Sequence, residues 1–161
     1  MIHNHGYGNH GSIKPFTRRT ALDETSIAKY ITDTFAGCET ADNFGYTFFF
    51  YGADRMRPFA TLAAADNDYD RVSNLDRPGV FRLNIGVSRQ TFQSLFGAEK
   101  VDVGGCDFTA LDKIMPHPVY APQFFVCVLN PSDATFEKVR MLLAEAYDLA
   151  VGRQRNREVR G

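Results

Sequence analysis

One histidine lies in a loop whose backbone has little freedom. His117 is enclosed by Pro116 and Pro118 in the run MPHPVYA, and prolines at these positions restrict the chain and remove a donor. A rigid loop that holds one imidazole is what a general base or a ligand-binding site requires, and Tyr120 joins His117 as a candidate binding residue. The alternative is that His117 hydrogen-bonds to backbone groups and locks the loop.

Two polar side chains share one face of a predicted strand, residues 80–87. Arg82 and Asn84 alternate there with apolar residues, so they face the opposite side of the sheet. A guanidinium binds a carboxylate or phosphate through two parallel hydrogen bonds, and Tyr51 of a neighbouring strand would add a hydroxyl. The alternative is a solvated face on which Arg82 pairs with an acid. A pocket over Arg82 is expected only for a functional site.

An acidic stretch has the spacing D-x-D-x-D at Asp66, Asp68 and Asp70. A calcium loop of the EF-hand type would need glycine at 71 and glutamate at 77. The sequence has Arg71 and Arg77 instead, so the stretch is interpreted as a polar turn.

Metal and nucleophile signals are weak. Cys106 and His117 could meet only through loop folding, and no CxxC pair or short helical spacing of ligands accompanies them. At the N-terminus, the terminal amine, two amides and the imidazole of His3 would be suitable ligands for Cu(II) or Ni(II). The alternative is that this segment is a disordered extension. No cofactor is predicted, and the common nucleotide and hydrolase motifs are absent.

Apolar periodicity predicts an α+β domain. The expected elements are helix 20–36, strands 46–51, 59–64 and 80–87, helix 89–96, strand 124–129 and helix 134–151. This order predicts an antiparallel sheet of about four strands, a three-strand meander and a returning fourth, packed against helices. Pro78 and Gly79 predict a type II turn before the third strand. We expect residues 1–19 to form a flexible His/Gly-rich arm, 20–152 the single domain and 153–161 a basic tail.

Three runs carry a resemblance to a known family: LDRPGVFRLNIGVSRQTFQSLFG (75–97), DFTALDKIMPHPVYAPQFFVCVLNPS (107–132) and LLAEAYDLA (142–150). Together they resemble an uncharacterised bacterial family of domains of unknown function, the 6194 group, from about Ile27 to Arg153. A His-Pro near a strand and a helix ending in Ala-Tyr are more distantly similar to luciferase-family and YjbR-like domains. That second resemblance implies a compact YjbR-like two-layer sandwich, and neither implies an activity.

Charge and hydropathy limit the partners. The formal net charge of -1 gives no whole-surface footprint for nucleic acid, so nucleic acid is an unexpected partner. The arginines of the tail could contact phosphate, or they could complement the negative end of a helix. No run approaches a membrane span or a secretory leader, so a cytoplasmic location is expected.

Three functional hypotheses follow. The first is a module that binds a small ligand or a partner protein through Tyr51, Arg82, Asn84, His117 and Tyr120. The second is an enzyme that uses His117 as acid or base and Arg82 as an anion clamp. The third is weak nucleic-acid binding through the tail and the sheet face. The first two differ in whether an acid or nucleophile lies near His117.

Overall fold

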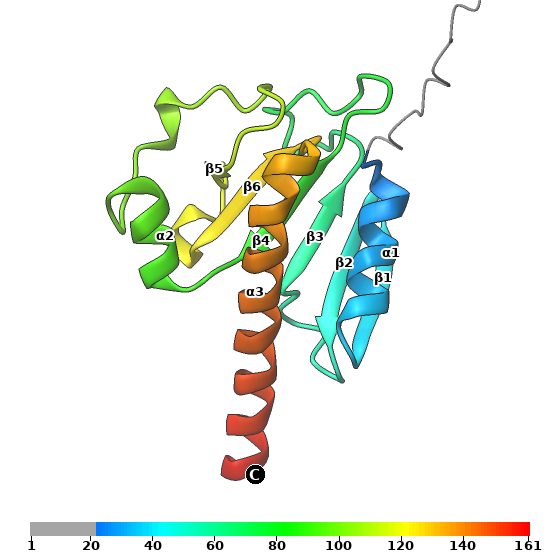
Figure 1. Cartoon of the computed structure of the whole chain (residues 1–161), viewed down its shortest axis with the longest axis vertical. Coiled ribbons are helices and arrows are strands. Elements are labelled where there is room, and N and C mark those ends of the chain that lie inside the picture. Colours follow the sequence, from blue (N-terminus) through cyan, green and yellow to red (C-terminus); the bar gives the residue numbers. More distant parts are fainter. Residues whose placement is uncertain (1–21) are drawn as a thin grey trace, which may run out of the picture.

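A six-stranded antiparallel sheet carries the fold (Figure 1). The structure, a computed structural model, describes residues 22–161. Its strands are β1 (Cys38–Asn43), β2 (Tyr46–Tyr51), β3 (Ala60–Ala63), β4 (Arg82–Gly86), β5 (Met115–Pro116) and β6 (Phe125–Leu129). Its helices are α1 (Glu24–Thr34), α2 (Arg89–Phe96) and α3 (Asp133–Arg160), with 3-10 turns at Val103–Gly105 and Ala121–Gln123. The spatial order is β1-β2-β3-β4-β6-β5, so the predicted α+β class and the β2–β3–β4 meander with β6 returning are confirmed.

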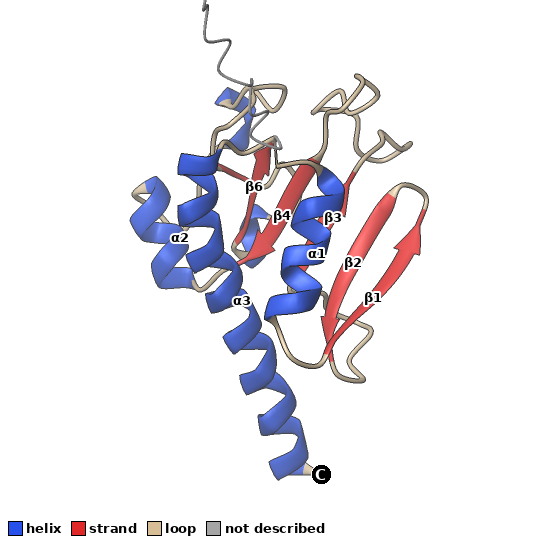
Figure 2. Ribbon diagram, turned by 45° about the vertical axis from the view of Figure 1, so that its right-hand side comes forward, coloured by secondary structure: helices blue, strands red, loops and turns tan. Residues whose placement is uncertain are grey.

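Helices α1 and α3 lie on the same face of the sheet (Figures 1 and 2). Their buried side chains pack against one set of strand residues, because alternate residues of a strand point to the same side. The members that form the centre of this core are Ile27 and Ile31 of α1, Val139 and Leu143 of α3, and Phe49, Leu62, Leu83, Ile85, Val126 and Val128 of the sheet.

Local signals place the helix starts. The side chain of Asp23 accepts a hydrogen bond from the Ser26 N–H at 2.7 Å and caps α1. Ser88 accepts from the Thr91 N–H at 3.1 Å and begins α2 at the predicted residue. Gly79 has φ of +73°, as the predicted type II turn requires.

Strand β1 was not predicted. Its sequence, CETADN, is polar and five of its six residues are exposed, so it has no alternating apolar pattern. It forms because Phe44 and Gly45 both adopt positive φ, +49° and +80°, which closes a two-residue hairpin onto β2. At the opposite edge β5 adds only two residues. The expectation of about four strands was therefore too low.

Helix α3 continues beyond its predicted end at residue 151 and reaches Arg160. The predicted tail, 153–161, is thus almost entirely helical. Arg157 donates to Asp54 at 2.8 Å, which joins the second half of the helix to the loop between β2 and β3. The ion pair at Arg157 supports the additional turns, because it ties them to that loop.

The face of the sheet away from α1 and α3 carries the polar strand residues. The strand register places Arg82 opposite Ala63 and Asn84 opposite Thr61, and Thr61 opposite Phe48. Loops 65–80 and 98–116 cover one end of this face with a small second core, formed by Ala63, Leu75, Phe108, Met115, Cys127 and Leu129. The remainder of the face is left without a helical layer.

The attachment of α2 to α3 gives a test of the packing. Glu145 of α3 accepts hydrogen bonds from the Ser88 hydroxyl at 2.9 Å and the Thr91 hydroxyl at 2.6 Å. We expect Glu145→Ala to lower the free energy of unfolding by about 1–2 kcal/mol, because part-buried hydroxyls lose a charged acceptor. Urea denaturation measures this loss. Glu137→Ala, on an exposed face of the same helix, is the control and should change it by less than about 0.5 kcal/mol; equal losses would contradict the inferred attachment.

Candidate functional site

A hollow of about 790 Å³ lies on the uncovered face of the sheet. Its floor is made by Thr61, Arg82 and Asn84 of β3 and β4, and His117 lies beside them. This volume falls in the range of small-molecule pockets, and its exposed lining is mainly apolar. We call this hollow the open-face pocket.

A continuous hydrogen-bond network forms the floor of the open-face pocket. The guanidinium of Arg82, fully buried, donates from Nε to Asn84 Oδ1 at 2.9 Å and from Nη1 to Ser73 Oγ at 2.9 Å. Both of its terminal nitrogens also donate to the carboxylate of Asp70. Asn84 in turn donates from Nδ2 to Thr61 Oγ1 at 2.9 Å. Three strand residues are thus tied to the loop that carries Asp70 and Ser73.

Asp70 and Arg82 remain a charged pair. Burial by itself would raise the pKa of Asp70, but the hydrogen bond and the charge of Arg82 outweigh it, so the pKa lies below its ordinary value. For Arg82, burial acts to lower the pKa, and the hydrogen bond and charge of Asp70 raise it above the ordinary value. The guanidinium fork is therefore already occupied by an internal carboxylate. The pair leaves the floor with no net charge for a ligand anion to meet.

Both the backbone and the imidazole of His117 are held by backbone groups. The backbone N–H of His117 donates to the Phe125 carbonyl at 2.9 Å, which extends the pairing of β5 with β6. Its imidazole Nδ1 accepts from the Val119 N–H at 3.0 Å and the Tyr120 N–H at 2.9 Å. The loop lock and the pocket position, expected as alternatives, therefore occur together.

These contacts decide which nitrogen of His117 carries the proton. Burial, followed by the charge of Arg82, lowers the pKa of His117 to about 3, although Asp70 opposes the shift. The ring is thus neutral near pH 7, and since Nδ1 accepts two hydrogen bonds, the proton is on Nε2. Among residues 22–161, Nε2 has no hydrogen-bond partner and is not a buried atom, so it opens to the pocket. His117 presents a fixed donor there rather than a base.

Aromatic side chains form the walls. Tyr46 and Phe48 stack along β2 with ring centroids 6.1 Å apart. On the other side the ring of His117 lies 5.0 Å from that of Tyr120, which lies 6.2 Å from Phe125. At the rim, Phe44, Met56 and Tyr69 are almost fully exposed. Such a lining is suited to an apolar body with ring-like shape.

The structure brings together four of the five proposed binding residues. Arg82, Asn84, His117 and Tyr120 all line the open-face pocket. Tyr51 lies on the opposite face of the sheet, where its ring meets Tyr147 of α3 edge-on at 5.5 Å. The prediction that Tyr51 lies beside Arg82 is wrong. In β2, residues 47, 49 and 51 point to the face that the helices cover.

Several residues of the site were missed from the sequence. Asp70 was interpreted as part of a polar turn, and the turn exists, but its carboxylate reaches Arg82 across the sheet face. Tyr46, Phe48 and Phe125 were assigned only to strands. The run YTFFFY has aromatic residues at both odd and even positions, so aromatic rings point to both faces of the strand. Only the register with β3 reveals which rings face the pocket.

Asp107 and Asp112, in the segment before β5, have structural roles. Asp107 accepts a hydrogen bond from the Thr109 N–H within its own turn, and Asp112 accepts one from the Ser132 N–H, which joins its loop to the start of α3. Burial raises the pKa of the Cys38 thiol to about 11 and that of Cys127 to about 12, so neither is a nucleophile at neutral pH.

No site for a metal ion is found in the described part. Within residues 22–161, no three His, Cys, Asp or Glu side chains gather as metal ligands. The candidate His3 lies outside the described residues. None of the helices in this range is long and apolar enough to cross a bilayer.

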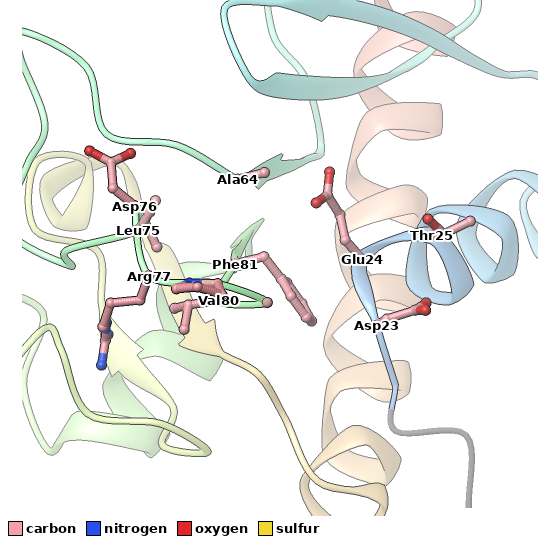
Figure 3. A pocket seen from close by; sticks show the side chains of 11 residues that line it. Asp23, Glu24, Thr25, Ala64, Leu75, Asp76, Arg77, Val80 and Phe81 are labelled. Atoms are coloured by element: carbon pink, nitrogen blue, oxygen red, sulfur yellow. The ribbon is translucent and has the colours of Figure 1, made fainter. Parts of the chain in front are cut away.

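A second hollow, of about 540 Å³, lies between the start of α1 and the turn before β4 (Figure 3). Glu24 faces the turn that carries Asp76 and Arg77. Asp23 caps α1, Asp76 accepts from a backbone N–H at 3.2 Å, and Arg77 donates to three backbone carbonyls. These polar groups are engaged in holding the turns, so the open-face pocket is the better candidate.

Comparison with protein families gives one match. The model of a family of unknown function, DUF6194, matches residues 22–159. The chain belongs to the DUF6194 family. No curated protein and no solved structure shows significant similarity to the chain. The resemblance to luciferase-family and YjbR-like domains therefore has no support, and the DUF6194 family itself carries no assigned activity.

The buried pair predicts a strong sensitivity at Asp70 of this DUF6194 domain. We expect Asp70→Asn to lower the free energy of unfolding by about 3 kcal/mol, because it leaves the fully buried charge of Arg82 without a counter-ion. Asp68→Asn, in the same loop but paired with Arg71 at the surface, is the matched control and should cost less than about 0.5 kcal/mol. Urea denaturation compares the two, and similar small losses would show that the pair is not a structural requirement.

The depressed pKa of His117 predicts a pH dependence of stability. Unfolded His117 takes up a proton near pH 6.5, whereas the folded form does so only at about 3. Between these values the unfolded state binds more protons, so stability falls as pH falls. Between pH 7 and pH 5, this residue should lower the free energy of unfolding by about 2 kcal/mol, which urea denaturation at the two pH values measures. His117→Asn should remove that part of the dependence; an unchanged slope would contradict it.

Proposed function

We propose that this DUF6194 domain binds a small molecule in the open-face pocket, with a ring-sized apolar body against the aromatic walls and one hydrogen-bond acceptor at His117. The observation that carries the proposal is the pair of backbone N–H groups on Nδ1 of His117, which leaves Nε2–H as a fixed donor in the pocket. A donor held by two hydrogen bonds is pre-organised, so less conformational entropy is lost when an acceptor binds.

The floor supports a ligand that binds by shape and hydrogen bonding. Arg82 and Asp70 neutralise one another, and Asn84 and Thr61 satisfy one another. A site whose polar groups are already paired keeps its form without a ligand. The apolar walls then provide most of the binding free energy, in proportion to the apolar area that they remove from water.

The enzyme alternative is less well supported by the same residues. A general base needs a free lone pair and a pKa near its working pH. In His117, Nδ1 already accepts two hydrogen bonds, and burial lowers the pKa of the ring to about 3. The guanidinium of Arg82, the proposed anion clamp, already binds Asp70. Binding is therefore the function that these contacts favour.

The test uses prodan, a neutral naphthalene with one ketone acceptor, whose emission changes on burial and on hydrogen bonding. We expect saturable binding to the full chain with blue-shifted emission. Phe48→Ala, which removes a wall ring, should weaken binding about threefold to tenfold. Met141→Ala is the control, because Met141 is an exposed apolar residue of α3 outside the pocket, and it should bind prodan as the unmodified chain does.

Two substitutions at His117 separate ligand binding from the loop lock. In His117→Asn the amide oxygen can still accept from the loop N–H groups, whereas the donor at Nε2 is lost. We expect it to keep the melting temperature at pH 7 within a few degrees and to weaken prodan binding about threefold to tenfold. His117→Ala should also lower stability, by about 1 kcal/mol. Absence of prodan binding, or unchanged affinity in both Phe48→Ala and His117→Asn, would overturn the proposed function.

A further inference from the structure

Among residues 22–161, only three charged side chains line the open-face pocket: Arg57, Asp70 and Arg82. Asp70 and Arg82 compensate each other. Arg57 is exposed at the mouth, and it has no hydrogen bond or ion pair with any residue in 22–161. The pocket therefore has one uncompensated positive charge, at its opening rather than on its floor.

The loop that carries Arg57 is held in place. Asp54 accepts a hydrogen bond from the Met56 N–H at 3.0 Å. It also forms an ion pair with Arg157 of α3 at 2.8 Å. Pro58 follows Arg57 directly, which restricts the backbone of Arg57 to extended conformations. Because Asp54 is engaged by Arg157, the nearest loop carboxylate is not free to pair with Arg57.

A second guanidinium, that of Arg153 on α3, does not line the pocket but lies within electrostatic reach of both Arg57 and Asp54. Arg153, one turn before Arg157 on α3, has a buried Nε without a hydrogen-bond partner, the sole such side-chain atom in the described chain. Burial, followed by the positive charge of Arg57, lowers the pKa of Arg153. Arg57 and Arg153 are thus close enough to repel one another, and an anion bound at Arg57 would reduce that repulsion.

We propose that the ligand of the open-face pocket is an amphipathic anion, whose apolar ring body lies against Tyr46 and Phe48 while its carboxylate or phosphate binds Arg57 at the mouth. This inference rests on the proposed function and adds the charge and the orientation of the ligand. The orientation follows because Tyr46 and Phe48 are half-buried whereas Arg57 is exposed. Planar guanidinium groups bind both oxyanions through paired hydrogen bonds, so the two sources share one recognition chemistry.

The experiment compares two fluorescent probes that have the same ring system. 8-Anilinonaphthalene-1-sulfonate carries an anionic group, and N-phenyl-1-naphthylamine is its neutral counterpart. We expect the full chain to bind the anionic probe at least about tenfold more tightly at low salt, and added NaCl to reduce that preference. Prodan should displace both probes, which places them in the same pocket.

Variants of three arginines locate the charge. Arg57→Gln should weaken binding of the anionic probe about tenfold and change the affinity for the neutral probe by less than about twofold. Arg153→Gln should weaken the anionic probe by a smaller factor. Arg155→Gln is the matched control, because Arg155 is exposed on the same helix and does not line the pocket, and it should bind both probes as the unmodified chain does.

Competition separates the two oxyanion sources. 1-Naphthaleneacetic acid and 1-naphthyl phosphate are each titrated against the bound anionic probe, and the stronger competitor identifies the preferred group. Failure of both to compete, or equal affinities of the anionic and neutral probes with no effect of Arg57→Gln, would overturn the anionic ligand and leave the pocket function standing. If neither probe responds to Phe48→Ala or to prodan, the proposed function itself fails.

Discussion

The buried ion pair between Arg82 and Asp70 is the constraint on which the uncovered face depends. A guanidinium in the middle of an antiparallel sheet has a high desolvation cost, which is offset only by a hydrogen-bonded counter-ion. Because Asp70 belongs to the loop after β3, that loop must fold across the sheet and bring Ser73 and Leu75 with it. One end of the face is thereby covered. The other end remains open and becomes the pocket.

The internal pairing of polar groups also determines which of them can contact a ligand in the pocket. Arg82 and Asn84 are committed to internal partners, and the Nδ1 atom of His117 is committed to the backbone. What remains for a ligand is one donor in the interior, aromatic walls, and the exposed charge of Arg57 at the entrance. Groups held in this way suit recognition better than proton transfer, since a proton acceptor must have a free lone pair.

Much of the fold was predictable because its signals are local. The predicted α2 and β2 have the observed bounds, 89–96 and 46–51, since Ser88 caps the helix and the aromatic run favours a strand. The edge strand β1 was not predictable from periodicity, because it is polar on both faces and is held by pairing with β2. The last turns of α3 were missed for a related reason: they depend on contacts with the loop that carries Asp54.

The sequence by itself made His117, Arg82, Asn84 and Tyr120 candidates for a site, because a proline-flanked imidazole and polar residues on an alternating strand are visible without coordinates. The tertiary structure decided that these four share one pocket and that Tyr51 does not, since only strand register assigns a parity to each face. It also decided that Asp70 is the partner of Arg82, and that His117 is a donor. Those outcomes depend on contacts between segments distant in sequence and on burial, which no local pattern encodes.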